Sequence, residues 1–392
     1  MTRLLYILPG FVPPDRDPAL DKFTYLSEIA QGEVLLPVWW DSENSASPFL
    51  RETFPVYRRG AFSYHLFLAF RFPPLVRRLA ILFFYVHRGL QLHREARFDV
   101  IKTWGTNLPG LAGVILKWIT GCELIVEIPN TPEDVYRYDT AHADAYARIK
   151  KFLADQLLFL VCTNADCIKL LYPWQISKYP RLRHKPTAVF HDLVAVHAIT
   201  AEQTEEPFIL LAGYPWYRKG VDILIRAFKL IADQFPDYKL KLMGYYPDRE
   251  YLNTLAGDCP QIEFLEPRPH EPALKVISAC CVYVSASRSE GMPRVLLEAM
   301  AARKPIVSSA VSGVPYYIKD NDNGLLFQSE NVEELATKLT ILLSSPELRA
   351  RLAKRAYDKV ISEYDERAYV HSFDNMLQSL RDKSLQPSND SN

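Results

Sequence analysis

The amino-acid sequence predicts an α/β protein made of two doubly wound, Rossmann-like domains that face each other across a cleft. The chain has 392 residues, which exceeds the size of one ordinary domain, so we expect two. Short apolar runs alternate with longer helical stretches, as in parallel βαβ units. A polar, acidic segment interrupts this alternation once, and the alternation then begins again. The two halves of the chain are therefore predicted to be built alike.

The first half, residues 1–200, is expected to form the N-terminal domain. Its first apolar run, 4–8, ends at Pro9 and Gly10, which is typical of a buried parallel strand that leads into a loop. The stretch 184–207 ends in the polar sequence ITAEQTEEP and is expected to link the domains. The other elements expected here are strands at 34–38, 99–102, 123–128 and 157–162 and helices at 111–120 and 146–155.

The second half, residues 201–362, repeats the pattern in a sheet of its own. Ligands of such sheets bind beyond the carboxyl ends of the strands, so two facing sheets would enclose a cleft. The stretch 363–380 is expected to be a helix that packs back on the first domain, and residues 381–392 a disordered tail. The other elements expected here are strands at 208–212, 238–243, 262–265, 281–285 and 305–309 and helices at 221–235 and 332–343.

Composition limits the kind of partner and the compartment. The formal net charge is 0, which argues neither for nor against a polyanionic partner, and we expect no nucleic-acid partner. The six cysteines form no CxxC pair and have no zinc-type histidine spacing, so free thiols in a reducing compartment are expected. The start, MTRLLYILPGF, has too short an apolar run for a signal peptide, and the longest apolar stretch is far below the roughly 18 to 20 residues that span a bilayer. We therefore expect a cytoplasmic protein.

The stretch SEGMPRVLLEAMA places two glutamates around the start of an apolar helix. Pro293 suits the first turn of a helix, and the free amides there, with the helix dipole, make an anion site. Glu290 would lie at the mouth of the cleft. Glu298 stands among apolar residues, where an unpaired carboxylate is costly to bury, and it could accept hydrogen bonds from a diol.

A second motif, AGYPWYRKGVDILIRAF, follows the expected strand at 208–212. The strand ends at Gly213, and an aromatic loop leads to Arg218 and Lys219 just before an amphipathic helix. Lys219 is therefore a candidate to neutralise a phosphate. The alternative is that Arg218 and Lys219 form a solvated basic pair on a loop.

Together, EGMPRVLLEAMA and GYPWYRKGVDILIRAF resemble the nucleotide-sugar-binding domain of retaining GT-B glycosyltransferases of family 4, the glycosyl transferases group 1. The resemblance covers about residues 208–327 and is compatible with the first half. It implies the GT-B fold and transfer of a hexosyl unit from a UDP- or GDP-linked sugar to a hydroxyl acceptor, with retention of configuration. It implies no metal and no other cofactor, because the protein supplies the positive charge itself.

The resemblance also implies roles for single residues. Glu298 would bind the ribose hydroxyls, Glu290 the donor sugar, and Lys219 the leaving diphosphate. Tyr214 stands where the family usually has arginine, and Arg218 is the candidate to replace it; the catalytic set is thus Glu290, Lys219 and Arg218. The implied donor-binding set is Gly213, Tyr214, Lys219, Arg268, Glu290, Gly291, Met292, Pro293, Arg294 and Glu298.

The first domain is expected to bind the acceptor through loops that follow its strands. Glu127 ends one strand where relatives often carry a histidine, although it could equally be a structural carboxylate. The end of the second-glutamate helix also departs from the family, because Arg303 stands in place of a glycine that permits a left-handed cap. The candidate acceptor-binding residues are Gly10, Trp104, Thr106, Asn107, Glu127 and Asn130.

Residues 58–97 are rich in arginine and large apolar side chains and nearly free of acids. Such a segment can lie on anionic membrane, which predicts a lipid-linked saccharide or glycolipid as acceptor, approached from the inner face of the membrane during cell-surface polysaccharide synthesis. The alternative is a pair of core helices with a solvated basic face. Two other functions stay open: a sugar-nucleotide epimerase, and a non-catalytic scaffold that binds nucleotide sugar or glycan.

Overall fold

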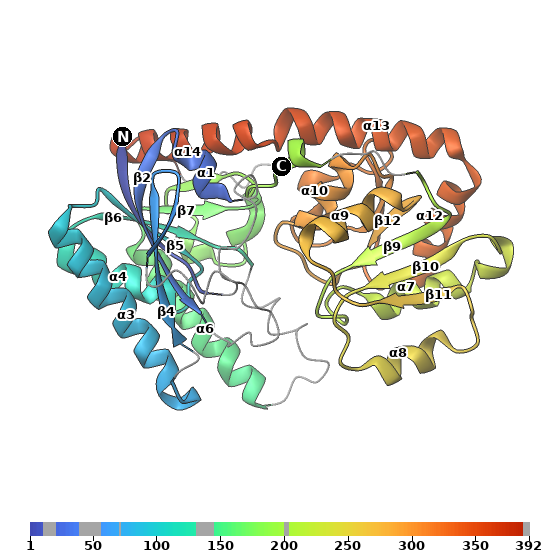
Figure 1. The fold of residues 1–392 in the computed structure, drawn as a ribbon, viewed down its shortest axis with the longest axis horizontal. Helices are drawn as coiled ribbons and strands as arrows, with labels where there is room; N and C mark the ends of the chain where they lie inside the picture. Colours follow the sequence, from blue (N-terminus) through green and yellow to red (C-terminus); the bar gives the residue numbers. More distant parts are fainter. Residues whose placement is uncertain (11–20, 39–55, 70–71, 131–144, 200–203, 387–392) are drawn as a thin grey trace. The chain divides into compact units, whose positions relative to one another are not determined.

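The computed structural model describes residues 1–10, 21–38, 56–69, 72–130, 145–199 and 204–386 (Figure 1). The chain divides into two compact units. The first comprises Met1–Pro132, Ile149–His191 and Tyr369–Asn392, and the second comprises Glu133–Arg148 and Asp192–Ala368. Each unit is built on one sheet, which confirms the predicted α/β fold with two Rossmann-like halves.

The first unit contains an eight-stranded sheet in the order β3-β4-β2-β1-β5-β6-β7-β8. All neighbouring strands are parallel except β3 and β4, which form an antiparallel pair at one edge. The central strands are buried on both faces, as parallel strands covered by helices must be. The strands are β1 (Thr2–Ile7), β2 (Ala30–Val38), β3 (Val56–Arg59), β4 (Phe62–Leu68), β5 (Val100–Trp104), β6 (Glu123–Glu127), β7 (Cys167–Leu170) and β8 (Thr187–Val189).

Helices α1 (Lys22–Leu26), α3 (Pro74–Glu95), α4 (Leu108–Thr120) and α6 (Ala145–Asn164) belong to the same half of the chain. The strand predicted at 157–162 is wrong, because these residues form the last part of α6. There Leu158 and Val161 are buried while Leu160 is exposed, which is a helical pattern that a continuous apolar run conceals. The predicted linker at 184–207 contains β8, and residues 200–203 lie outside the described part of the chain.

The second unit contains a six-stranded parallel sheet in the order β11-β10-β9-β12-β13-β14. Chain order reverses between β9 and β12, and ligands of open α/β sheets bind beside such a switch point. Its strands are β9 (Phe208–Ala212), β10 (Lys239–Met243), β11 (Ile262–Leu265), β12 (Val282–Ser285), β13 (Ile306–Ser309) and β14 (Leu325–Phe327). Its helices are α7 (Val221–Lys229), α8 (Arg249–Ala256), α9 (His270–Ala279), α10 (Arg294–Ala301), α11 (Val314–Tyr317), α12 (Val332–Ser344) and α13 (Pro346–Glu363).

Helix boundaries in the second half of the chain also differ from the sequence-based expectation. The helix predicted at 221–235 ends at Lys229, and a short 3-10 turn, Ala232–Gln234, follows it. The helix predicted at 363–380 begins later, because α13 ends at Glu363 and a new helix, α14 (Glu366–Arg381), starts where Asp365 caps the amide of Ala368. Arg303 has a φ of 56°, so the left-handed cap after α10 is present, and its guanidinium lies 3.7 Å from the ring centre of Tyr357.

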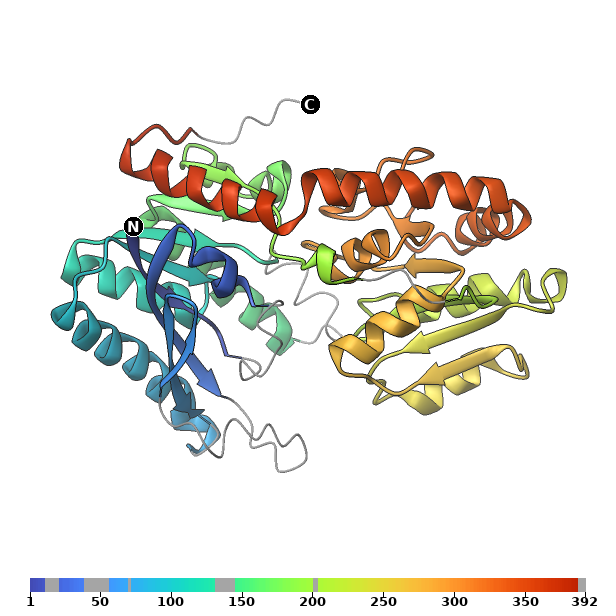
Figure 2. The same ribbon diagram turned by 45° about the horizontal axis from the view of Figure 1, so that its top comes forward.

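The end of the chain completes the first unit. In Figure 2, helix α14 (red) lies along the green strands of that unit. Its Tyr369 and Phe373 rings pack against Phe190, and the amide of Thr187 in β8 donates to the carbonyl of Gln386. Among the described residues, no helix is long and apolar enough to cross a membrane.

Candidate functional site

Two loops meet at the switch point of the second sheet: 213–220 after β9 and 286–293 after β12. The amide of Arg288 donates to the carbonyl of Arg218 across 2.8 Å. Gly220 has a φ of 66°, and a Cβ at this position would lie 1.9 Å from the carbonyl oxygen of Ala286. Only glycine fits this contact, because any side chain would push the two loops apart.

Arg288 holds the same two loops together with its side chain. Its guanidinium makes a two-pronged pair with Asp222 at the start of α7, with both N–O distances at 2.8 Å. It also donates to the carbonyl of Tyr217 and lies 3.9 Å from the centre of that ring. Burial alone would lower the pKa of Arg288, but the hydrogen bonds to Asp222 raise it, so the side chain stays charged. Arg288 was not predicted as a site residue, since its partner lies 66 residues away in the sequence.

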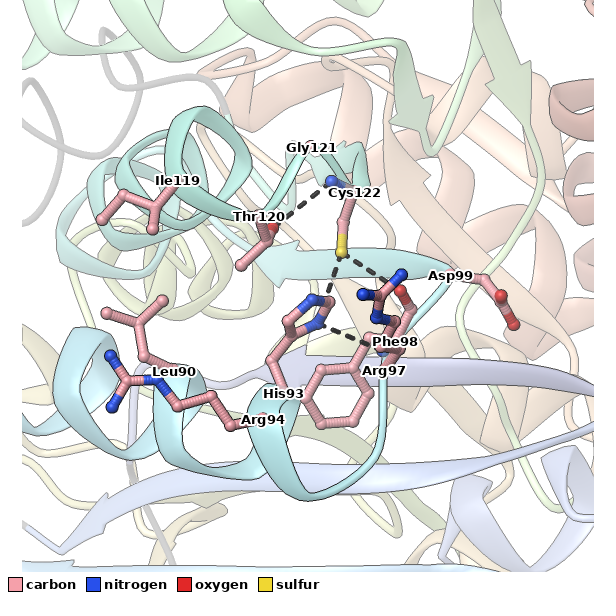
Figure 3. Close-up of a pocket in the computed structure, with 10 residues that line it drawn as sticks. All are labelled: Leu90, His93, Arg94, Arg97, Phe98, Asp99, Ile119, Thr120, Gly121 and Cys122. Carbon is pink, nitrogen blue, oxygen red and sulfur yellow. Dashed lines mark hydrogen bonds between the residues drawn. The ribbon is translucent and has the colours of Figure 1, made fainter.

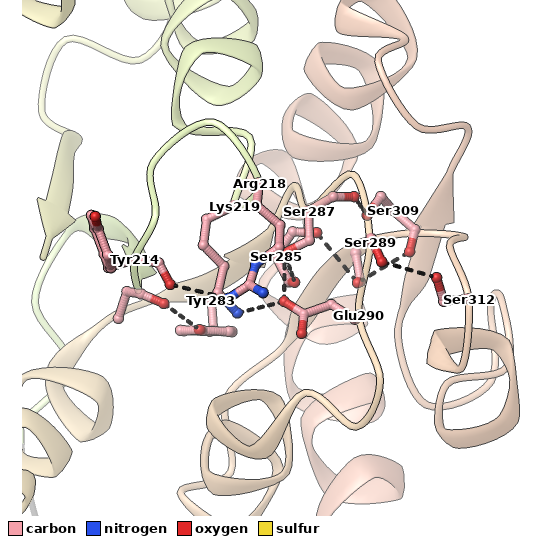
Figure 4. Close-up of polar contacts among 12 residues, drawn as sticks. Tyr214, Arg218, Lys219, Tyr283, Ser285, Ser287, Ser289, Glu290, Ser309 and Ser312 are labelled. Atoms are coloured by element: carbon pink, nitrogen blue, oxygen red, sulfur yellow. Dashed lines mark hydrogen bonds and ion pairs between the residues drawn. The ribbon is translucent and has the colours of Figure 1, made fainter. Parts of the chain in front are cut away.

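Lys219 and Glu290 form the polar centre of the site (Figure 4). Lys219 Nζ lies 2.5 Å from Glu290 Oε1, and Ser287 Oγ donates to the same oxygen across 2.7 Å. Burial raises the pKa of Glu290, but Lys219, Ser287 and Arg218 outweigh burial and leave the pKa below its usual value. The structure therefore places an ionised carboxylate against a lysine at the carboxyl end of the sheet.

Hydroxyl groups support the loop that carries Glu290. Ser309 at the end of β13 donates to the carbonyl of Ser287 across 2.6 Å, and Ser289 lies 3.5 Å from the hydroxyl of Ser312 (Figure 4). These contacts tie the loop to the neighbouring strand, so Glu290 is held by its surroundings as well as by Lys219. The serines were not predicted as site residues.

The start of α10 differs in one detail from the predicted anion site. Pro293 is the N-cap, and the amide of Arg294 donates back to the carbonyl of Met292. Pro293 has no amide hydrogen, so within residues 291–294 the amides of Gly291 and Met292 are the ones left for an anion. The sulfur of Met292 accepts a hydrogen bond from the amide of Asp192.

Glu298 has a protein partner. One of its carboxylate oxygens lies 2.9 Å from His270 Nε2 at the start of α9, and the carboxylate is buried. The other imidazole nitrogen, Nδ1, is buried with no hydrogen-bond partner among the described residues. His270 therefore orients the carboxylate that the sequence assigns to a diol. His270 was not predicted, although it follows the β11 loop that contains Arg268, which is exposed.

A cavity of about 170 Å³ lies at the switch point, wholly within the second unit. Of the predicted donor residues, Lys219, Glu290, Met292, Pro293 and Arg294 line it, together with Ser285 and Ser287. The remaining predicted donor residues are not part of its lining. They are Gly213, Tyr214, Arg268, Gly291 and Glu298, and the predicted catalytic residue Arg218 also stays outside it.

Tyr214 and Arg218 lie on the loop after β9. Tyr214 is half exposed, and its ring centre lies 5.6 Å from that of Tyr245 after β10. The guanidinium of Arg218 is 3.4 Å from the carbonyl of Tyr214, within the same loop. Arg218 is therefore close to the site and contributes to the low pKa of Glu290.

The predicted acceptor residues lie in the first unit, at or just after the carboxyl ends of β1, β5 and β6. Asn107 and Asn130 are exposed, Trp104 is partly exposed, and Thr106 and Gly10 are buried. Gly10 has a φ of 76°, and a Cβ there would lie 1.9 Å from the carbonyl oxygen of Pro37. The structure thus gathers these residues at one edge of the sheet, and their contact with an acceptor stays a prediction.

Glu127 is enclosed in a charged network on the first sheet. Its two oxygens accept hydrogen bonds from Lys102 on β5 and Lys169 on β7, and all three side chains are 1% exposed. Lys102 also donates to the hydroxyl of Tyr6 across 2.5 Å. Burial lowers the pKa of Lys102 to about 8, although Glu127 opposes this shift. This environment favours the structural interpretation of Glu127 over the acceptor-binding one.

A larger cavity, about 670 Å³, lies at the opposite edge of the first sheet (Figure 3). It is formed by the last turns of α3 and α4, near the starts of β5 and β6. His93 Nδ1 accepts the amide of Phe98 there, and burial, with a contribution from Arg97, lowers its pKa. This cavity is separate from the carboxyl edge where the predicted acceptor residues gather.

Among the described residues, one group of side chains has suitable spacing to hold a metal ion: His197, Asp365 and Glu366. It lies where α14 begins, and none of the predicted donor residues belongs to it. The positively charged residues that line the switch-point cavity are Lys219 and Arg294.

Comparison with known structures defines the class of fold. The described architecture is the GT-B glycosyltransferase fold, shared with sucrose-phosphate synthase from Thermosynechococcus elongatus at a TM-score of 0.74. That match covers 98% of this chain and 100% of the other at 19% identity. Anabaena HepE, solved in complex with UDP-glucose, matches with a TM-score of 0.69 over 97% of this chain and 100% of the other at 14% identity.

Sequence comparison points to one family within this class. The family model described as glycosyl transferases group 1 matches residues 195–359. An uncharacterized glycosyltransferase of Haemophilus influenzae is 32% identical over 41% of this chain and 48% of its own length. The chain spans about half the length of the curated relatives that it matches, 48% and 60% for the first two. The family model and these relatives show that part of this chain is similar to glycosyl transferases group 1.

Proposed function

We propose that this protein is a retaining glycosyltransferase of family 4 that moves a hexosyl unit from a nucleoside diphosphate sugar to a hydroxyl acceptor. The observation that carries the proposal is the ion pair of Lys219 with the buried Glu290, 2.5 Å apart at the switch point of the second sheet. Glu298 lies on the helix that follows, as the family pattern requires. Ligands of open α/β sheets bind at this point.

Lys219 supports the departure of the nucleoside diphosphate. Its ammonium pairs with Glu290, so a bound diphosphate would compete with that carboxylate for the lysine. Charge that develops on the leaving phosphate is best stabilised by donors already held in place. The leaving phosphate itself would take the proton of the acceptor hydroxyl, so the reaction needs no separate general base. Positioning of the two substrates and electrostatic stabilisation of the leaving group then account for the rate acceleration.

Glu298 binds the ribose of the donor in this proposal. An ionised carboxylate can accept hydrogen bonds from both hydroxyls of a diol. His270 holds one oxygen from the protein side, which fixes the plane of the carboxylate before the nucleotide arrives. Arg268, exposed on the loop before α9, would lie near the base. A UDP- or GDP-linked donor is proposed, with no metal, because Lys219 and Arg294, which line the cavity, provide the positive charge.

The proposed acceptor is a lipid-linked saccharide or glycolipid of cell-surface polysaccharide synthesis, met at the inner, cytoplasmic face of the membrane. Helix α3 supports this, since Arg78 and Leu79 on it are exposed. Such a helix can rest on anionic lipid. One curated relative, from Rhizobium meliloti and 26% identical, is named a lipopolysaccharide core biosynthesis glycosyltransferase.

A binding screen followed by product analysis tests the proposal. Calorimetry against UDP, GDP, ADP and their sugars should give saturable binding of one nucleotide. Glu298→Ala should weaken the affinity for this nucleotide by about tenfold or more, because a hydrogen bond to a charged group contributes about that much to binding. Glu271→Ala, an exposed glutamate of α9, is the matched control and should bind as the wild type does.

The reaction products then separate the possible functions. A new glycosidic product with the donor's anomeric configuration supports the proposal. Isomerised donor without transfer would indicate an epimerase, and binding without any product a scaffold. If no nucleotide binds, the donor site itself is refuted.

A further inference from the structure

Helix α6 carries an apolar surface that its own unit does not cover. In its first turns within that unit, Ile149, Phe152 and Leu153 are 59%, 62% and 59% exposed. Further along the same helix, Leu158 and Val161 are fully buried against the sheet. The N-terminal part of α6 therefore presents to solvent the kind of side chains that its C-terminal part uses for the core. Neighbouring large apolar groups on one exposed helical surface mark a contact site.

Helix α3 shows the same arrangement at its N-terminal end. Leu79 and Phe83 are 70% and 67% exposed, and Val76 is exposed beside them. Spacings of three and four residues place these three side chains on one stripe of the helix.

The two apolar surfaces lie at the same end of the unit. Helix α3 ends at Glu95, shortly before β5 begins, and α6 ends at Asn164, shortly before β7 begins. Both helices therefore finish at the amino edge of a parallel sheet and begin toward its carboxyl edge (Figure 1). The predicted acceptor residues gather at that carboxyl edge, so the apolar turns of both helices flank the place where an acceptor would be held.

The charges beside these surfaces indicate which kind of partner covers them. In α3 the only acidic residue is Glu95, at its far end, whereas Arg77 and Arg78 stand among the apolar side chains. In α6 the only acidic residue is Asp155, which lies 3.8 Å from Lys151. Exposed apolar groups bordered by basic groups and almost no acids match the interface of an anionic bilayer.

We propose that the N-terminal turns of α6 insert into an anionic lipid surface beside those of α3, so that the bilayer faces the carboxyl edge of the first sheet. This rests on the proposed function, in which the acceptor is lipid-linked. It adds a second membrane-contacting element and a direction of approach: the hydroxyl end of the acceptor reaches the strand ends directly from the lipid surface. The donor site in the second unit plays no part in lipid binding.

Vesicle flotation of the full chain tests the proposal. The wild type should float with phosphatidylcholine vesicles that contain phosphatidylglycerol and much less with phosphatidylcholine alone. The double variant Phe152→Ser, Leu153→Ser should reduce the bound fraction by about tenfold, because two largely exposed apolar side chains no longer enter the interface. The double variant Leu79→Ser, Phe83→Ser should have a similar effect.

Matched substitutions in the second unit provide the control. Leu230 and Ile341 are 55% and 43% exposed there, and changing both to serine should leave flotation unchanged. Retained flotation of the α6 variant, with loss in the α3 variant, would overturn the role of α6. If the wild type does not float, or if it forms a dimer in light scattering that the α6 variant loses, lipid is not the partner of this surface. Nucleotide binding, measured in every variant, reports on the donor site separately.

Discussion

Replacing Glu127 by glutamine should destabilise the first unit strongly. The glutamine oxygen can accept from only one of Lys102 and Lys169, and its amide group would face the other ammonium as a second donor. Because these side chains are 1% exposed, one positive charge loses its partner away from water. Breaking a buried ion pair costs about 3–5 kcal/mol. A unit of this size shifts in Tm by about 2–4 °C for each kcal/mol, so we expect a decrease of about 10 °C.

Differential scanning calorimetry measures the effect, and the pH dependence adds a second test. Burial lowers the pKa of Lys102 to about 8 although Glu127 raises it, so without Glu127 this lysine loses its proton, and with it the unpaired charge, at lower pH. The destabilisation by Glu127→Gln should therefore shrink as the pH rises toward 8. Glu263→Gln is the control, because its lysine partner is half exposed and such pairs contribute less than about 1 kcal/mol. Unchanged Tm with lost transfer to the acceptor would refute the structural role and assign Glu127 to acceptor binding.

Three further predictions concern the loops and the charged network. Gly220→Ala brings a Cβ against the carbonyl of Ala286, so nucleotide affinity should fall by about tenfold in calorimetry, while unchanged affinity would show that the loops can separate freely. Arg288→Met leaves Asp222 buried without its partner, and urea unfolding should show a loss of about 3 kcal/mol that Arg288→Lys partly restores. Because Lys102 binds its proton less tightly when folded, stability should rise from about pH 8 toward its ordinary pKa of 10.5, and Lys102→Met should lose that rise.

Local patterns were enough to predict most of the second unit. The strands predicted at 208–212 and 262–265 have those bounds in the structure, because each is a short apolar run between clear breaks. Lys219 and Glu290 were chosen from two separate motifs, and the structure brings them together although they are 71 residues apart. Each residue could be predicted from the motif that contains it, and the parallel sheet then places the two motifs side by side.

The first unit was harder to predict because charged residues lie inside it. Strand β7 has the sequence CIKL, and its lysine suggests a surface, yet Lys169 is fully buried beside Glu127. Its partner lies 42 residues away, so no local spacing could reveal the pair. His270 was missed for the same reason, since its contact with Glu298 joins residues 28 positions apart.

The return of the chain end to the first unit affects the order in which the two units can complete their folding during synthesis. The second unit's main segment, Asp192–Ala368, is continuous and is synthesised before Tyr369 is joined to the chain. The N-terminal unit, synthesised first, obtains the aromatic cover of Tyr369 and Phe373 last. The unit that is translated first is thus the one that completes its folding last. In a purified chain that ends at residue 368, proteolysis should find the second unit protected and the first more open.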